Sequence, residues 1–185
     1  MPRPNAREKI LDAAEQLLLA HGPTGLVLDA VAEEAGVSKG GLLYHFGSKE
    51  ALAEGLTDRM GSSFDRAQEE IRAADPEAPG RHTRAYLRST VGEDGKPADG
   101  SARLMAGILA ALGGDPARLD ALRERFAEWH RRLDRDGIDP VNATLVRLAA
   151  DGLWLSELLG LSPLPPGRAE PVLEALAELT GEPTS

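Results

Sequence analysis

The sequence contains no cysteine, and this absence excludes several kinds of structure and chemistry. Without cysteine the chain has no disulfide framework and no thiolate for a metal site. Three of its histidines, His21, His82 and His130, show no metal-ligand spacing, and the HExxH motif is absent. We therefore predict neither a metal site nor a cofactor.

Long apolar runs and aromatic residues are also scarce. No apolar run is long enough to span a bilayer. The first nine residues, MPRPNAREK, have no apolar segment behind their charges and do not resemble a signal peptide. We expect a cytoplasmic protein that does not bind membranes. Aromatic residues make up 4% of the 185 residues and apolar residues 42%, so the core must be built on Leu and Ala, which favours helices over sheets.

Motifs of catalysis are missing as well. The chain has no GxSxG elbow, no P-loop and no dinucleotide-binding fingerprint. Paired acidic residues such as Glu69 and Glu70 are expected on an exposed helix face. We predict that the protein is not an enzyme.

The acidic balance of the chain argues against a general nucleic-acid binder, because the net charge is −9. Even residues 1–60 hold six Lys and Arg against nine Asp and Glu, a net −3. The basic residues are nevertheless grouped at the N-terminus and around 39–49, and the acidic ones mostly lie elsewhere. Such a local basic edge predicts few phosphate contacts and modest non-specific affinity for DNA.

The stretch from Val27 to Leu52 has the pattern of a helix-turn-helix. Apolar residues at three-and-four spacing predict a short helix over 28–35. Gly36 ends it, as a residue that tolerates positive φ does just past a helix end. Ser38 is then placed to cap a second helix with its hydroxyl, and the two short helices joined by a glycine-containing turn complete the motif.

The second helix begins with two residues that disfavour helices. Gly40 and Gly41 each cost about 1 kcal/mol relative to Ala, but they let a helix N-terminus, with its free amides, come close to an anion such as phosphate. Lys39 adds a mobile cation beside them, and Lys49 lies in the first turn of the next helix, where a cation is locally unfavourable. The residues expected to contact DNA are Ser38, Lys39, Gly40, Gly41, Tyr44, His45 and Lys49.

The residues GVSKGGLLYHF at 36–46 and SKEAL at 48–52 resemble the DNA-binding signature of the TetR (tetracycline-repressor-like) transcriptional regulators. This resemblance implies an all-helical homodimer whose N-terminal domain binds operator double-stranded DNA and whose C-terminal domain binds a small effector. Two positions depart from the family pattern. Val27 stands where a Thr or Ser often caps the helix and touches phosphate, and Leu43 stands where a Tyr is commonest.

Apolar periodicity and capping residues predict an all-α chain of about nine helices. Besides the two in the motif, helices are expected over 5–20, 48–74, 81–92, 101–112, 116–135, 140–161 and 168–180. The helix at 101–112 is markedly apolar and is expected at the centre of the C-terminal body. We predict a helix-turn-helix domain over 1–47 and an effector-binding and dimerisation domain over 48–185.

Two functional surfaces are predicted in the body. An effector pocket is expected among residues at apolar positions of the body helices, with two polar residues nearby: Met105, Leu109, Phe126, Trp129, His130, Asn142, Trp154 and Leu158. The helix at 140–161 is apolar nearly all round, so with the last helix it is expected to form a two-fold dimer interface. The candidates for that interface are Leu145, Leu148, Leu155, Leu159, Val172, Leu173 and Leu176.

These features predict a repressor that binds a palindromic operator as a homodimer and is released by a small, largely apolar effector. The alternative is a DNA-binding regulator with no small-molecule ligand, controlled by a partner protein. A closed apolar cavity with a few polar groups in the body distinguishes the first from the second.

Overall fold

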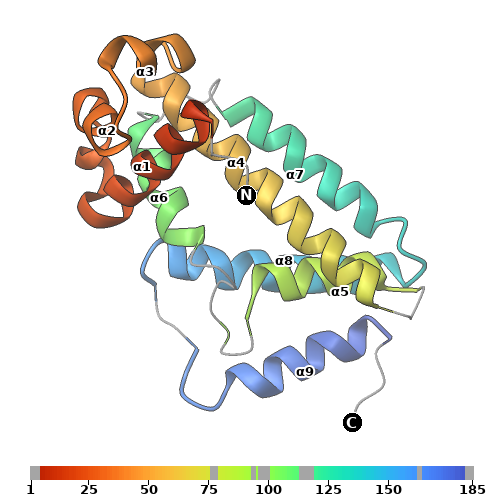
Figure 1. The fold of residues 1–185 in the computed structure, drawn as a ribbon. Coiled ribbons are helices and arrows are strands. Elements are labelled where there is room, and N and C mark those ends of the chain that lie inside the picture. Colours follow the sequence, from red (N-terminus) through yellow and green to blue (C-terminus); the bar gives the residue numbers. More distant parts are fainter. Residues whose placement is uncertain are drawn as a thin grey trace. The chain divides into compact units, whose positions relative to one another are not determined.

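The computed structural model describes residues 5–75, 79–92, 95, 101–112, 119–161 and 164–181. The chain divides into two compact units, residues 1–60 with 103–120 and residues 61–102 with 121–185. The described residues form nine α-helices and one short 3-10 helix, which confirms the predicted all-α class (Figure 1). Their bounds are α1 Ala6–His21, η1 Gly22–Gly25, α2 Leu28–Glu34, α3 Lys39–His45, α4 Lys49–Ala74, α5 Arg81–Thr90, α6 Ser101–Ala111, α7 Asp120–Leu133, α8 Pro140–Leu158 and α9 Ala169–Leu179.

Four helix starts predicted from local sequence are confirmed by their capping bonds. The side chain of Asn5 accepts from the amide of Glu8 at 2.9 Å, and Asp139 accepts from the amide of Val141 at 2.8 Å. Ser38 and Ser48 cap α3 and α4 in the same way, with N–H to Oγ distances of 3.0 and 3.1 Å. Each bond satisfies an amide that the first turn of a helix leaves without a partner.

The first unit is built on one apolar core under α1, α2 and α3. Its fully buried side chains come from these helices, from the link before α2, from the first half of α4 and from α6: Ile10, Leu11, Ala14, Leu26, Val31, Leu42, Leu52 and Ile108. Arg59 on α4 fastens this core from outside by pairing with Asp12 at 2.6 Å and with Glu15, both on α1. The expectation that α6 lies at the centre of the C-terminal body is therefore wrong, because its apolar face packs in the core of the first unit.

Of the two glycines in α4, Gly55 has a clear packing reason. A Cβ there would lie 2.6 Å from Cε1 of Phe46, whose ring is buried. The cost of a glycine within the unbroken helix Lys49–Ala74 is offset at this position by the close approach that it permits. At Gly61 the nearest atoms belong to the far end of the flexible Arg125 side chain.

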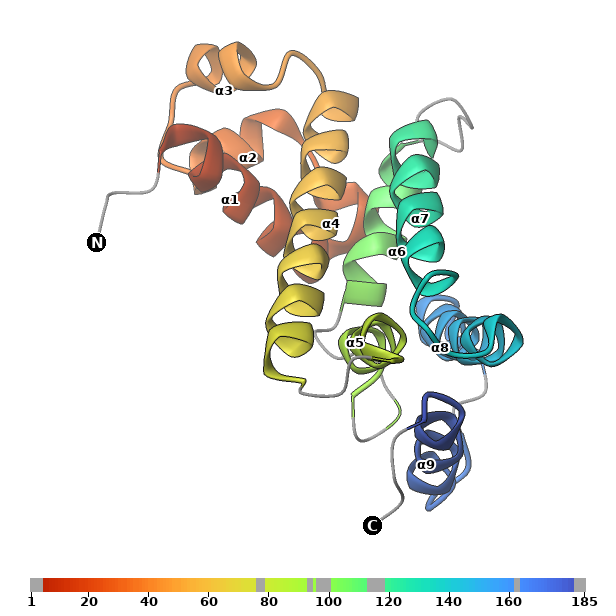
Figure 2. The same cartoon turned by 90° about the vertical axis from the view of Figure 1, so that its right-hand side faces the viewer.

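The second unit has a separate core between α5, α7, α8 and α9. Its buried residues include Tyr86, Trp129, Val146 and Leu176. Helix α8 packs against both α5 and α9 (Figures 1 and 2). Small residues on the inner side of α8, among them Ala143 and Ala150, are buried in this contact.

A buried arginine ties distant segments of the second unit together. Arg84 is 2% exposed and pairs with Asp75 at 2.6 Å, just beyond α4. The same guanidinium donates to the carbonyl of Thr180 at 3.1 Å, at the end of α9. Loss of either side chain of such a pair leaves an uncompensated buried charge.

The start of the helix predicted over 116–135, at residues 116–118, lies outside the described residues. Within the described part, no helix is long and apolar enough to cross a membrane, and no group of three or more acidic or histidine side chains is arranged to hold a metal ion.

The N-terminus of α2 generates a stability prediction. Val27 occupies the cap position with extended backbone and no side-chain bond, and it is 51% exposed. Val27→Ser should raise the free energy of unfolding by about 1 kcal/mol, because its hydroxyl can accept from a first-turn amide, and Ser38→Ala should lower it by about 1 kcal/mol. Urea unfolding of the three proteins measures both, and equal midpoints for all three would contradict the capping argument.

Candidate DNA-binding and effector sites

The helix-turn-helix is formed by α2 and α3. Gly36 takes a φ of +64° in the turn between them, as its predicted role requires. Leu42 is fully buried and Phe46 is 4% exposed, so these two side chains anchor α3 to the core of the first unit. The opposite side of α3 thereby turns to solvent.

The predicted DNA-contacting residues of α3 lie on this solvent side. Ser38, Lys39, Gly40, Tyr44 and His45 are exposed, and Tyr44 is 86% exposed. The rings of Tyr44 and His45 meet edge to face, with centroids 5.2 Å apart. Gly41 is half-buried, and its amide donates to Oγ of Ser38. The structure thus places these residues together on one helix, and their contact with DNA stays a prediction.

The two lysines are engaged within the free chain. Lys49 is half-buried at the start of α4, and its Nζ donates to the carbonyl of Pro23 at 3.4 Å. Lys39 pairs with Asp29 in the first turn of α2, with Nζ 2.8 Å from Oδ1. The sequence analysis missed Asp29, because nothing in the local pattern shows that a residue ten positions earlier meets Lys39.

An aromatic cluster lies in the second unit. Phe64 on α4, Tyr86 on α5, and Phe126 and Trp129 on α7 are arranged edge to face, with centroid distances between 4.6 and 5.7 Å. They are four of the seven Phe, Tyr and Trp residues in the chain. Edge-to-face geometry is the favourable one for such rings. The sequence had indicated Phe126 and Trp129 for this region but not Phe64 or Tyr86, whose helices gave no signal beyond apolar spacing.

Two carboxylates hold the polar ends of this cluster. The indole N–H of Trp129 donates to Asp65 at 2.6 Å, and the hydroxyl of Tyr86 donates to Asp151 at 2.5 Å. Burial of Tyr86 raises the pKa of its hydroxyl, and the charge of Asp151 raises that pKa further. The phenol therefore stays protonated and acts as a donor.

His130 borders the same cluster. Its ring lies 6.0 Å from that of Phe126, and its buried Nε2 makes no hydrogen bond in the described structure. The nearest carboxylate oxygen, Oδ2 of Asp151, is 4.0 Å from that nitrogen. Burial lowers the pKa of His130, and the nearby Arg147 lowers it further. This histidine favours the neutral form in the folded chain.

The remaining predicted effector residues are spread over both units. The indole of Trp154 donates to Oγ of Ser101 at 3.1 Å, while Asn142 and Leu158 are half-buried on α8. Met105 and Leu109 belong to α6 in the first unit. Of the eight candidates, the structure brings Phe126, Trp129 and His130 into ring contact.

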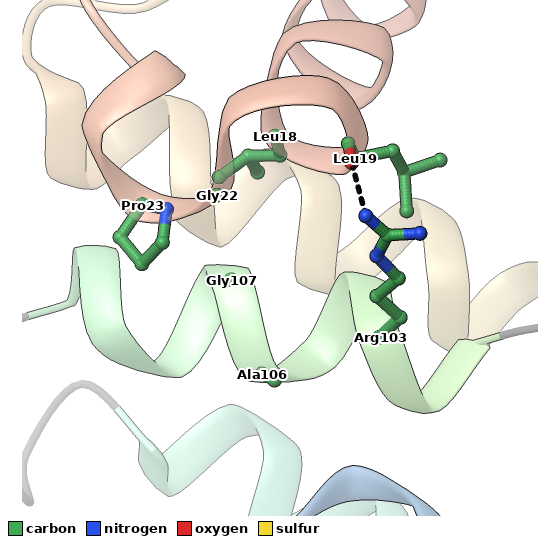
Figure 3. A pocket seen from close by; sticks show the side chains of 7 residues that line it. All are labelled: Leu18, Leu19, Gly22, Pro23, Arg103, Ala106 and Gly107. Carbon is green, nitrogen blue, oxygen red and sulfur yellow. Dashed lines mark hydrogen bonds between the residues drawn. The ribbon is translucent and has the colours of Figure 1, made fainter. Parts of the chain in front are cut away.

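A pocket is present in the first unit, between the end of α1 and α6 (Figure 3). It is open, has a volume of about 230 Å³, and includes none of the predicted effector residues. Arg103 crosses its edge and donates to the carbonyl of Leu19 at 3.0 Å. Small-molecule sites usually enclose about 300–1,000 Å³, so this pocket is smaller than a site for a drug-sized effector.

Two family descriptions match the chain. The description "Bacterial regulatory proteins, tetR family" matches residues 10–56, which contain α2 and α3, and "Tetracyclin repressor-like, C-terminal domain" matches residues 80–181. The chain belongs to the TetR family of transcriptional regulators. Members of this family are DNA-binding transcription factors and not enzymes, in agreement with the sequence analysis.

Individual relatives agree with this assignment. The chain is 33% identical over 129 residues to the HTH-type transcriptional regulator LmrA of Bacillus subtilis, a match that covers 68% of this chain and 67% of that protein. A TetR family structure from Streptomyces coelicolor is 28% identical, covers 98% of this chain and 100% of its own, and has a TM-score of 0.65. The multidrug binding protein EbrR, crystallised with malachite green, is 29% identical with the same coverage and a TM-score of 0.64.

The lowered pKa of His130 generates a prediction on pH dependence. The unfolded chain binds this proton more readily than the folded chain, so stability should fall as pH drops below about 6.5 towards the lower folded pKa. His130→Phe removes this contribution and should lose less stability than the wild type between about pH 7 and pH 5. The exposed His21 gives a matched control as His21→Phe. Parallel pH profiles for the wild type and His130→Phe, from urea unfolding, would refute the assignment.

Proposed function

We propose that this regulator is a repressor that binds a palindromic operator as a homodimer and leaves the DNA when a small, largely apolar effector binds. The observation that carries the proposal is the outer face of α3, where Lys39, Gly40 and Tyr44 are open to solvent while Leu42 is fully buried. In this proposal residues 1–47 bind DNA, residues 48–185 bind effector and form the dimer, and the protein acts in the cytoplasm.

The proposed mode of reading places the N-terminus of α3 in the major groove. Lys39 reaches base edges, where guanine O6 and N7 accept hydrogen bonds from lysine. Tyr44, His45 and Lys49 contact phosphates, which fix position without reading sequence. The exposed Gly40 supports this arrangement, because a Cβ built there meets no atom of the chain within 4 Å. The close approach that glycine permits is therefore not needed by the fold itself.

The dimer is proposed to form through α8 and α9, which would pack against their copies as a four-helix bundle. The exposed apolar residues of α8 and of its C-cap support it: Val141, Leu145, Leu148, Leu155 and the cap Leu159, each 46–64% exposed. At 100° per residue they fall within an arc of about 80°, opposite the buried Val146 and Ala150. Leu176 lies in the core of the second unit and Val172 and Leu173 pack against it, so α8 supplies most of the open surface. A two-fold dimer would read half-sites about 34–36 Å apart.

The proposed effector class follows from the aromatic cluster of Phe64, Tyr86, Phe126 and Trp129 and its few polar groups. EbrR has been crystallised with malachite green and with ethidium, so malachite green is a suitable first probe. A ligand of this class should change the tryptophan emission and also cause the protein to leave the DNA. It can shift the equilibrium between the DNA-bound and released states only if it binds one of them more tightly. If neither the tryptophan emission nor the binding to DNA changes, the result favours the alternative, a regulator without a small-molecule ligand that is controlled by a partner protein.

Gly40→Leu tests the proposed approach to DNA. The substitution should keep or raise the melting temperature, since Gly costs about 1 kcal/mol in a helix, yet it should abolish binding to a duplex enriched from a random library by the wild-type protein. Gly41 is a less clean position, because a Cβ there lies 3.2 Å from Oγ of Ser38. Ala127→Leu, which puts the same side chain at an exposed position of α7 outside both proposed surfaces, is the control and should leave DNA affinity unchanged. Normal operator binding by Gly40→Leu defeats the proposed mode.

Leu148→Glu tests the proposed interface. Leu148 is 53% exposed in the single chain, so the substitution should leave the fold intact but turn the dimer into monomers, because a carboxylate would be buried in an apolar contact. Sedimentation measures the change. Leu43→Glu puts the same charge on an exposed leucine of α3 and should remain dimeric. A dimeric Leu148→Glu would rule out this face of α8.

A further inference from the structure

The ion pair between Lys39 and Asp29 joins the two helices of the helix-turn-helix at their outer edge. Nζ of Lys39 lies 2.8 Å from one carboxylate oxygen of Asp29 and 3.1 Å from the other. The two side chains are 61% and 67% exposed. An exposed pair of this kind contributes little to stability. An acid in the first turn of α2 favours that helix, but the fold does not require it to pair with a residue proposed to read DNA.

The chemistry of the pair would allow Asp29 to orient the ammonium group of Lys39. A lysine ammonium has three N–H donors on a flexible stem, and it acts as a point charge that any phosphate can attract. Asp29 occupies one side of that ammonium and leaves donors free for the two acceptors of a guanine edge. A lysine held in this way loses less side-chain freedom on binding a base than a free lysine does.

The same carboxylate also acts on the DNA backbone. Asp29 lies in the first turn of α2, and in a helix-turn-helix the first helix crosses the phosphate backbone. A negative charge there repels phosphates of every sequence alike, and it offsets the positive charge with which Lys39 would attract a phosphate. Both effects lower non-specific affinity, which is set by phosphate neutralisation.

We propose that Asp29 is a positioning residue that sets specificity: it aims Lys39 at a base edge and penalises binding to the backbone. This inference rests on the proposed DNA-binding function of α3. In this proposal Asp29 increases the discrimination between specific and non-specific DNA and lowers the affinity for DNA. A residue that merely favoured the N-terminus of α2 would change stability and leave discrimination untouched.

The test compares Asp29→Asn with Glu34→Gln. Glu34 is exposed on the same helix, about 140° around it from Asp29 at 100° per residue, so both variants remove one negative charge. Each protein is titrated with a duplex enriched from a random library by the wild type and with a scrambled duplex of the same composition, over a range of salt concentrations. Thermal melting confirms that each variant is folded.

Asp29→Asn should bind the scrambled duplex about three- to tenfold more tightly, and its ratio of specific to non-specific affinity should fall about tenfold, the factor that one lost base contact commonly carries. The salt dependence on scrambled DNA should steepen by about one ion, because the freed Lys39 gains a phosphate. Glu34→Gln should raise both affinities alike and keep the ratio. An unchanged ratio in Asp29→Asn, or equal ratios in the two variants, overturns the inference.

A second comparison shows whether Asp29 acts through Lys39. In a Lys39→Ala background, Asp29→Asn should no longer change base preference, since coupled residues give non-additive effects. Additive changes in preference would show that Asp29 acts independently of Lys39 and would also overturn the inference. Failure of the wild-type protein to enrich any duplex counts against the proposed function instead, so the two failures are distinct.

Discussion

The burial of Leu42 and Phe46 under α3 is the contact on which the DNA-binding element depends. A helix of seven residues that contains two glycines has little stability of its own. Its position comes from these two side chains, which reach the core of the first unit, and from the cap that Ser38 provides. Because the inner side and the cap hold the helix, its outer side is free of packing demands and can carry residues chosen for binding.

In the second unit, helix α8 likewise has one side that packs within the chain and another side that is open to solvent. One side of α8 uses small residues such as Ala143 and Ala150 to pack closely within the chain. Its other side leaves large leucines open, which a single chain has no reason to maintain. Between the helices, Asp65 and Asp151 fix the orientations of Trp129 and Tyr86 through hydrogen bonds. The aromatic cluster therefore has a defined geometry and does not rest on apolar contact alone.

Features that depend on neighbours in sequence could be predicted from the sequence. The cap by Ser38 was predicted correctly because the bonded amide lies three residues away. The caps by Asn5, Ser48 and Asp139 are equally local, with the bonded amide two or three residues on. The N-terminus of α5 shows the opposite case. Its amides at His82 and Thr83 are bound by the carboxylate of Asp136, 54 and 53 residues away, and no local pattern indicates that partner.

The sequence by itself determined the helices, the family and the outward-facing residues of α3, since all three depend on the spacing of residues within one or two helical turns. Only the tertiary structure decided which core α6 joins, that Phe64 and Tyr86 complete the aromatic cluster, and that Asp29 holds Lys39. Those contacts join residues from different helices. Apolar spacing shows that a helix has a buried side, but it does not show which helix covers that side, because every apolar face is attracted to every other through the same non-directional effect.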